Sequence, residues 1–205
     1  MIENGMTNHE IAKELPQYMF RLRDIDNVRQ TMLEERYKGT RRLDIEVTYV
    51  YGQTGAGKTR GIMDKYGDEK VYRVTDYTHP FDSYRCQEVI VFDEFRSSLK
   101  IQNMLNYLDI YPLELPARYN NKWACYTKVF IVSNIPLEAQ YVNVQFENEP
   151  TWAAFLGRIK LVKEYKDGEI IVRPADPRNT IPLEKLGEVV AQALPPALQM
   201  ELPGQ

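Results

Sequence analysis

Eight consecutive residues, Gly52 to Thr59, read GQTGAGKT and match the pattern G-x-x-x-x-G-K-T. In this pattern the glycines let the backbone turn so that its N–H groups bind phosphate oxygens, together with the N-terminus of the following helix. Lys58 then places a cation on the β- and γ-phosphates, and the Thr59 hydroxyl binds Mg²⁺. The sequence therefore predicts an ATP site whose contacts come from Gly52, Gly55, Ala56, Gly57, Lys58, Thr59 and Arg60. The alternative is a glycine-rich turn without a ligand.

An acidic pair forms the second half of the predicted site. The segment VIVFDEF delivers Asp93 and Glu94 at the carboxyl end of an apolar strand, where ligands bind in open α/β sheets. We expect Asp93 to hold Mg²⁺, directly or through water, and Glu94 to polarise the attacking water. The segment KVFIVSN ends another apolar strand with Asn134, whose amide would orient that water. A solvated strand end and a turn-forming asparagine before Ile135-Pro136 are the alternatives.

A basic segment lies between these two strands. In LPARYNNKWACYTK, Arg118 and Lys122 flank a turn-prone pair of asparagines, and aromatic residues such as Tyr119 are interleaved with them. Cations suit the phosphates of single-stranded DNA, and aromatic faces suit its bases. The segment is predicted to be a DNA-binding hairpin, with a solvated hairpin that buries its aromatics as the alternative.

The elements that must position these residues alternate between strands and helices. Short apolar runs rich in β-branched and aromatic residues predict strands at 45–51, 70–74, 88–95 and 128–134. Helices are predicted at 58–66 and at 97–112, the second with Ser97 as its cap. Such alternation is typical of an α/β fold around a largely parallel sheet. At 158–174, two β-runs flank Asp167-Gly168, which predicts a hairpin.

The two ends of the chain differ from this pattern. Residues 7–38 are predicted to be helical, with Thr7 and Glu10 at the spacing of a capping box. The apolar stripe of this segment packs either on its own domain or on a neighbouring subunit. The tail from Ala175 is rich in Pro, Ala and Leu, and one weak helix is expected near 183–194.

Composition bounds the possibilities for the 205-residue chain. It contains no apolar run of about 18 residues, so we expect no membrane span, and its first residues do not resemble a signal peptide. Two cysteines are too few for a disulfide framework or a zinc site, which favours a reducing cytoplasm. A net charge of −3 does not indicate a nucleic-acid binder, but it does not exclude a few placed basic residues inside a ring.

The order of phosphate loop, acidic strand, basic hairpin and Asn-terminated strand resembles the superfamily 3 helicases. Within them it is similar to the helicase domain of replication initiator (Rep) proteins from circular single-stranded DNA viruses and bacterial rolling-circle plasmids. FDSYRCQEVIVFDEF resembles the family's W-D-G-Y stretch, with Phe81 in place of Trp. YPLELPARYNNK resembles the segment around the family's basic motif, and FLGRIK resembles the stretch that supplies an arginine finger, Arg158. The whole looks closer to plasmid initiators than to viral ones.

The resemblance implies an AAA+-like P-loop NTPase that assembles as a hexameric ring, with ATP between subunits and Arg158 reaching the neighbour's nucleotide. Basic hairpins would line a central pore and move along single-stranded DNA in the 3′ to 5′ direction. The implied organisation is a helical oligomerisation segment (1–40), the helicase ATPase domain (41–175) and a C-terminal tail (176–205). A bacterial protein would act in the cytoplasm, and a viral one in the host nucleus.

The chain departs from the family pattern in one respect, and other functions are possible. Family members usually begin with a nicking endonuclease that needs a His-hydrophobe-His motif, and the chain has only His9 and His79. We therefore expect no nicking chemistry, either because the chain is a fragment or because it is a natural helicase-only version. The alternative function is a regulatory or remodelling ATPase that does not use DNA. A small-molecule kinase is disfavoured because no Arg-rich lid is evident.

Overall fold

The computed structural model describes residues 6–118 and 120–176, and its centre is a six-stranded sheet. The strand order is β2-β3-β6-β1-β7-β8. The strands are β1 (Glu46–Gly52), β2 (Val71–Val74), β3 (Val89–Phe92), β6 (Lys128–Val132), β7 (Leu161–Lys166) and β8 (Glu169–Pro174). All neighbouring pairs are parallel except β7 and β8. The predicted α/β fold with a largely parallel sheet, typical of P-loop NTPases, is confirmed.

The register brings the carboxyl ends of the middle strands to one edge of the sheet. Phe92 at the end of β3 pairs with Ile131 in β6, and Val50 in β1 pairs with Val132 at the end of β6. Because β6 lies between β3 and β1, the segments that follow these three strands emerge side by side. We call this side the nucleotide edge.

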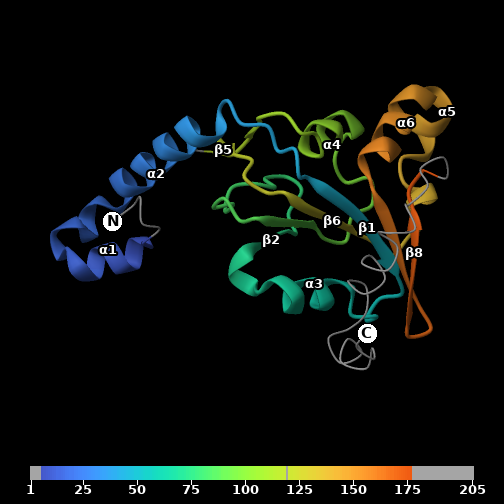
Figure 1. The fold of residues 1–205 in the computed structure, drawn as a ribbon, viewed down its shortest axis with the longest axis horizontal. Coiled ribbons are helices and arrows are strands. Elements are labelled where there is room, and N and C mark those ends of the chain that lie inside the picture. Colours follow the sequence, from blue (N-terminus) through green and yellow to red (C-terminus); the bar gives the residue numbers. More distant parts are fainter. Residues whose placement is uncertain (1–5, 119, 177–205) are drawn as a thin grey trace, which may run out of the picture.

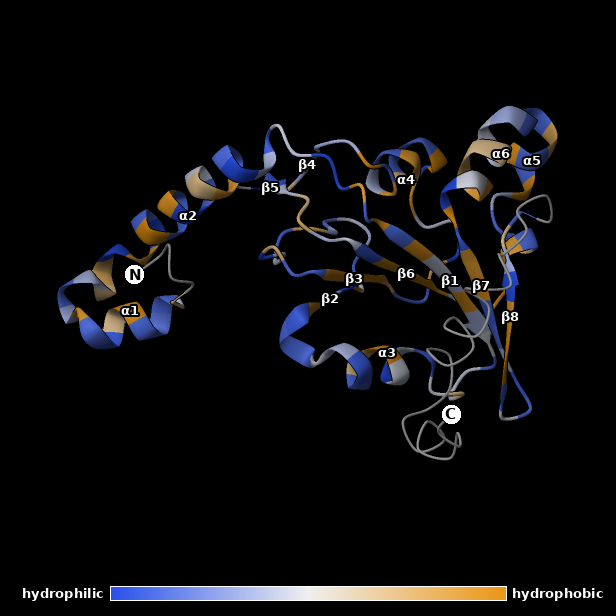
Figure 2. Ribbon diagram, in the orientation of Figure 1, coloured by the Kyte–Doolittle hydropathy of each residue, from blue (hydrophilic) through white to orange (hydrophobic). Residues whose placement is uncertain are grey.

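Helices cover both faces of the sheet (Figure 1). On one face, α3 (Lys58–Tyr66) packs Ile62 into a cluster with Val50 and other strand residues. On the other face, α4 (Ile101–Tyr107) and α6 (Glu149–Arg158) bury Met104 and Phe155 in a larger aromatic cluster. The short helices are α5 (Val142–Glu147), η2 (Asp68–Lys70) and η3 (Leu137–Ala139). Figure 2 shows the hydrophobic residues concentrated along the central strands, as expected for a parallel sheet covered on both faces.

Both hairpins form where the sequence predicted them. β4 (Glu114–Leu115) and β5 (Lys122–Trp123) are a small antiparallel pair outside the main sheet. The turn between β7 and β8 places Asp167 at φ 51° and Gly168 at φ 83°. Two successive positive φ angles match the twist of the flanking strands, which explains the Asp-Gly sequence.

The prediction that Ser97 caps a helix is wrong. Helix α4 begins only at Ile101, and its N-cap position is Lys100, which makes no side-chain cap. Ser97 instead donates hydrogen bonds from its backbone N–H (2.7 Å) and its hydroxyl (2.9 Å) to Oε1 of Gln140. Ser97 therefore forms hydrogen bonds with Gln140, which is distant in sequence, and does not cap the helix that the local pattern predicted.

The N-terminal helices form an arm that extends away from the sheet (Figure 1). The arm contains α1 (Asn8–Glu14), the 3₁₀ helix η1 (Pro16–Arg21) and α2 (Leu22–Tyr37). The capping box of Thr7 and Glu10 is present. Of the predicted stripe, Ile25 is buried, but Val28 remains 48% exposed. Phe20 is 98% exposed, so the chain's own domain leaves a large part of the arm's apolar surface uncovered.

The two cysteines lie together. A disulfide joins Cys86, in the segment between β2 and β3, to Cys125, just before β6. One bond is not a disulfide framework, but disulfides persist in oxidising environments, so this pair gives no support to the expected reducing compartment. Across residues 6–118 and 120–176, no helix has both the length and the hydrophobicity to cross a bilayer.

Candidate nucleotide site

The predicted phosphate loop connects β1 to α3 at the nucleotide edge. Gly55 and Gly57 have φ angles of 84° and 81°, a left-handed backbone that favours glycine. Gly52 also has a positive φ angle, 147°, and a Cβ atom there would in addition collide with the backbone carbonyl oxygen of Tyr165 on β7. Ala56 is exposed in the loop, and Arg60 is exposed in the first turn of α3. The backbone therefore favours glycine at all three glycine positions of the loop.

Lys58 lies inside this loop. Its Nζ donates hydrogen bonds to the carbonyl oxygens of Gly52 and Gln53, each at 2.8 Å. Burial lowers the pKa of Lys58, while the nearby carboxylates of Glu94 and Asp93 act in the opposite direction. The ammonium group is therefore held at the end of β1, with two acidic side chains close enough to favour its charged form.

Asp93 connects the acidic strand to the phosphate loop. Its side chain is 5% exposed. Oδ1 accepts hydrogen bonds from the Thr59 hydroxyl (2.9 Å) and from the backbone N–H of Glu94 (3.1 Å). The structure thus brings together the two residues predicted to bind the metal. A hydroxyl and a carboxylate fit Mg²⁺, which is usually held by one or two protein oxygens together with phosphates and waters.

Arg73 is a site residue that the sequence did not reveal. It lies on β2, and its Nε (3.1 Å) and Nη2 (2.5 Å) both approach Oδ2 of Asp93. The hydroxyl of Tyr77 also donates a hydrogen bond to the backbone carbonyl of Asp93, at 2.7 Å. Neither contact has a local signal, because both depend on β2 being the neighbour of β3 in the sheet.

Glu94 and Asn134 follow adjacent strands at the same edge. Glu94 is exposed and has a φ of 51°, a strained backbone conformation for a residue other than glycine. Asn134 is half-buried, and its Oδ1 accepts a hydrogen bond from Nε of Arg96 at 3.0 Å. The side chains predicted to polarise and orient water thus emerge from adjacent strands, and Arg96 links Asn134 to the segment that carries Glu94.

The buried side-chain amide of Gln140 holds together the segments that carry Glu94 and Asn134. Gln140 is 0% exposed. Its Nε2 lies 3.0 Å from the carbonyl oxygen of Phe95 and 3.3 Å from the Ser133 hydroxyl, while its Oε1 accepts from Ser97. Nε2 is also 2.8 Å from the hydroxyl of Tyr49. Gln140 therefore joins the residues just after Glu94 to those just before Asn134, another arrangement without a local sequence signal.

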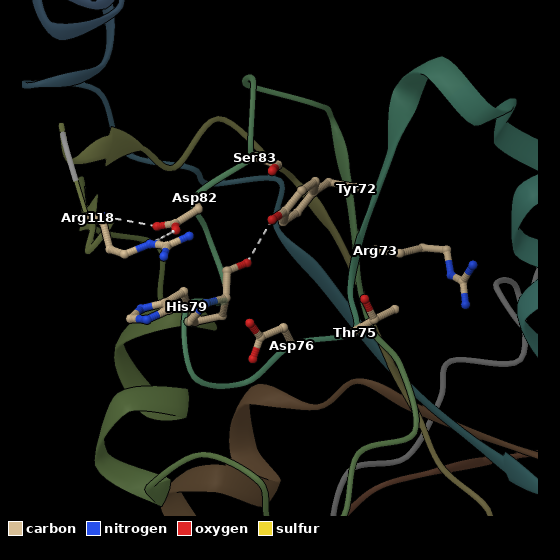
Figure 3. Close-up of a pocket in the computed structure, with 9 residues that line it drawn as sticks. Tyr72, Arg73, Thr75, Asp76, His79, Asp82, Ser83 and Arg118 are labelled. Atoms are coloured by element: carbon tan, nitrogen blue, oxygen red, sulfur yellow. Dashed lines mark hydrogen bonds and ion pairs between the residues drawn. The ribbon is translucent and has the colours of Figure 1, made fainter.

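The predicted DNA-binding residues lie away from the nucleotide edge. Arg118 forms an ion pair with Asp82 at 2.5 Å, which ties the hairpin to the segment between β2 and β3. Lys122 is half-exposed on β5, and Tyr119 lies outside the described residues. Arg118 and Asp82 line a polar cavity of about 300 Å³. Arg73, the partner of Asp93, also lines this cavity, although Figure 3 shows its guanidinium pointing away from Arg118 and Asp82.

Arg158 lies near the amino ends of β1 and β7, whereas the phosphate loop follows the carboxyl end of β1. It ends α6, just before β7, where the N–H of Lys160 donates to the carbonyl of Val47 near the start of β1. Its Nη2 donates to Oδ2 of Asp109 at 2.6 Å, and its Nη1 donates to the carbonyl of Ala154 at 2.9 Å. The structure therefore does not bring Arg158 together with Lys58 of the same chain.

Comparison with known proteins identifies relatives of the part of the chain that contains this site. Residues 48–134 match the model of a family described as RNA helicase. The replication-associated protein of beak and feather disease virus is 28% identical over 141 residues, which are 68% of this chain and 46% of the relative. That of goose circovirus is 29% identical over 112 residues, 54% of this chain and 36% of the relative.

The pigeon circovirus protein of the same name is 30% identical over 96 residues, 47% of this chain and 29% of the relative. The chain thus spans less than half the length of these curated relatives. All three are viral, so they give no support to the expected closeness to plasmid initiators. The part of the chain that holds the phosphate loop, the acidic pair and Asn134 is thus similar to a helicase family and to replication-associated proteins, which supports the predicted resemblance to a helicase domain of the Rep type.

Proposed function

We propose that the chain hydrolyses ATP with Mg²⁺ and uses the energy to move along single-stranded DNA, as the superfamily 3 helicase domain of a rolling-circle replication initiator. The observation that carries this proposal is the hydrogen bond from Thr59 to Asp93, because it closes the phosphate loop onto the acidic strand. Two residues distant in sequence and both suited to Mg²⁺ meet beside a buried lysine.

Each residue has a role that follows from its position. Lys58 leaves the loop carbonyls for the β- and γ-phosphates, and the glycine-rich backbone binds phosphate oxygens. Thr59 and Asp93 would hold Mg²⁺, which would neutralise negative charge on the phosphate oxygens. Glu94 accepts a proton from the attacking water, and Asn134 orients that water.

The decisive experiment compares two variants at this edge. Lys58→Ala removes the phosphate cation, so nucleotide binding and hydrolysis should both be lost. Glu94→Gln keeps a similar shape but cannot take up a proton, so binding should persist while turnover falls by about 10²-fold or more. Binding is measured with a fluorescent ATP analogue, and turnover by phosphate release. Normal hydrolysis by Glu94→Gln would show that another group is the base.

The effect of single-stranded DNA on ATP hydrolysis distinguishes a helicase from a remodelling ATPase, the alternative that the sequence leaves open. A helicase should hydrolyse ATP faster when DNA is added, whereas a protein-remodelling ATPase should not respond. Lys122→Ala should weaken DNA binding and reduce the slope of log K against log salt by about 0.7 for each DNA phosphate that the variant no longer neutralises. Its ATP turnover without DNA should stay unchanged, because Lys122 lies outside the nucleotide edge.

A ring would explain both the arm and Arg158. The exposed arm at residues 6–37 would serve as the oligomerisation segment, and Arg158 would reach the nucleotide of a neighbouring subunit. A guanidinium suits this role because it stabilises charge on the γ-phosphoryl oxygens. To act in this way, Arg158 must leave Asp109.

Mixing two inactive variants tests the ring. Arg158→Ala should bind ATP but hydrolyse it slowly, and Glu94→Gln should behave similarly. Mixed rings contain interfaces with an intact Glu94 on one side and an intact Arg158 on the other, so some activity should return. Asp109→Asn is the control for the internal ion pair, and it should retain hydrolysis. Equal loss of turnover in Arg158→Ala and Asp109→Asn would mean that the arginine acts only inside its own subunit.

A further inference from the structure

The pairing of Arg73 with Asp93 is unequal in exposure. The arginine side chain is 45% exposed, whereas the carboxylate is 5% exposed. Arg73 reaches Asp93 from β2, the edge strand of the sheet, where it pairs in register with Val91 of β3. One partner is therefore fixed in the protein interior, and the other extends from the surface.

The two oxygens of Asp93 have different partners. Oδ1 accepts from Thr59 and from the N–H of Glu94, which are parts of the predicted metal site. Oδ2 accepts only cationic donors among its hydrogen bonds in the described residues, namely Nε and Nη2 of Arg73. The guanidinium thus places a positive charge on the carboxylate from the side opposite to Thr59.

This arrangement satisfies a requirement of the chain without nucleotide. A buried carboxylate is costly unless it is paired and hydrogen-bonded. Arg73 supplies the charge, and because its side chain is 45% exposed, water can solvate the guanidinium once another cation pairs with Asp93. A divalent cation near Asp93 would meet the guanidinium as a competing like charge.

We propose that Arg73 is a built-in counter-ion for the metal-binding carboxylate. It neutralises Asp93 when the nucleotide is absent, and it withdraws from Oδ2 when Mg²⁺ and nucleotide bind. Arg73 is then a positioning residue that sets the Mg²⁺ concentration at which the site fills. This inference rests on the proposed function, because it assumes that Thr59 and Asp93 hold Mg²⁺.

The test measures binding rather than turnover. A fluorescent ATP analogue is titrated with Mg²⁺ for the full chain and its Arg73→Gln variant. Removing the competing charge should lower the half-saturating Mg²⁺ concentration by about three-fold. Arg73→Lys keeps the charge and should stay near the unaltered chain. Lys128→Gln is the matched control, because Lys128 pairs with Glu46 at the other end of β1, at 2.7 Å.

A second readout uses melting temperature. In EDTA, Arg73→Gln should melt below the unaltered chain, since the buried carboxylate has lost its cation, and Mg²⁺ with the analogue should narrow that difference. An unchanged or higher half-saturating Mg²⁺ concentration would overturn the inference alone. If the unaltered chain binds the analogue at no Mg²⁺ concentration, both the inference and the proposed function fail.

Discussion

The nucleotide edge buries charged side chains, whereas the N-terminal arm exposes apolar ones. At the edge, Lys58 and Asp93 are buried polar groups, and each is held by named partners from other elements. In the arm, Phe20 and Met19 are apolar, yet they are 98% and 57% exposed. The edge is therefore defined within one chain, whereas the arm leaves exposed the kind of surface that usually binds another protein.

The largest expected effect contrasts two phenylalanines. Phe155→Ala removes a 0% exposed ring from the core under α6 and should lower the free energy of unfolding by about 4 kcal/mol. Phe20→Ala should change it by less than about 0.5 kcal/mol in dilute monomer, because that ring contacts little within the chain. Urea denaturation measures both. Similar losses would mean that the arm packs on its own domain.

A smaller effect is expected at Gln140. Gln140→Leu removes the hydrogen bonds of the buried amide to Ser97, Tyr49 and the carbonyl oxygen of Phe95 and should cost about 2 kcal/mol of unfolding free energy. Turnover should fall more than nucleotide affinity, because the segments carrying Glu94 and Asn134 lose their shared support. The same substitution at Gln102, exposed on α4, is the control. A similar effect at both sites would remove the case for a positioning role.

The substitution expected to change the free energy of unfolding least should change self-association most. Phe20→Ser replaces an exposed ring with a polar side chain, so unfolding of the dilute monomer should hardly change. If the arm binds a second copy, sedimentation should show association weakened by about ten-fold or more, since central aromatic anchors dominate interfaces. Thr31→Ser, at an exposed position on α2, controls for a general effect of substitution within the arm. Unaltered association would assign the exposed ring to some other partner.

The sequence predicted the parts of the site that depend on local order. The phosphate loop, the acidic pair and Asn134 each follow a strand, and parallel strands end at a common edge. Prediction failed where a contact joins distant segments. Ser97 looked like a helix cap because its partner Gln140 lies 43 residues away, a separation that local patterns do not encode. Arg73 gave no signal for the same reason.

Ion pairs between segments distant in sequence also involve two arginines for which the sequence predicts external partners, Arg118 and Arg158. The sequence predicts that Arg118 contacts DNA and that Arg158 reaches a neighbouring nucleotide. The structure pairs them with Asp82 and Asp109, carboxylates contributed by other segments. Any external role for these arginines begins with the separation of an internal ion pair, which residue type and spacing alone did not indicate.

The backbone of Glu94 has a consequence for protein engineering. Its φ of 51° is a conformation that costs most residues about 1 kcal/mol or more, whereas glycine adopts it freely. A selection for heat-resistant variants would therefore favour glycine at this position and would discard the proposed catalytic carboxylate in the process. Stabilising substitutions should therefore be sought at other positions and Glu94 should be kept, because at this residue higher thermal stability would come with lower ATP turnover.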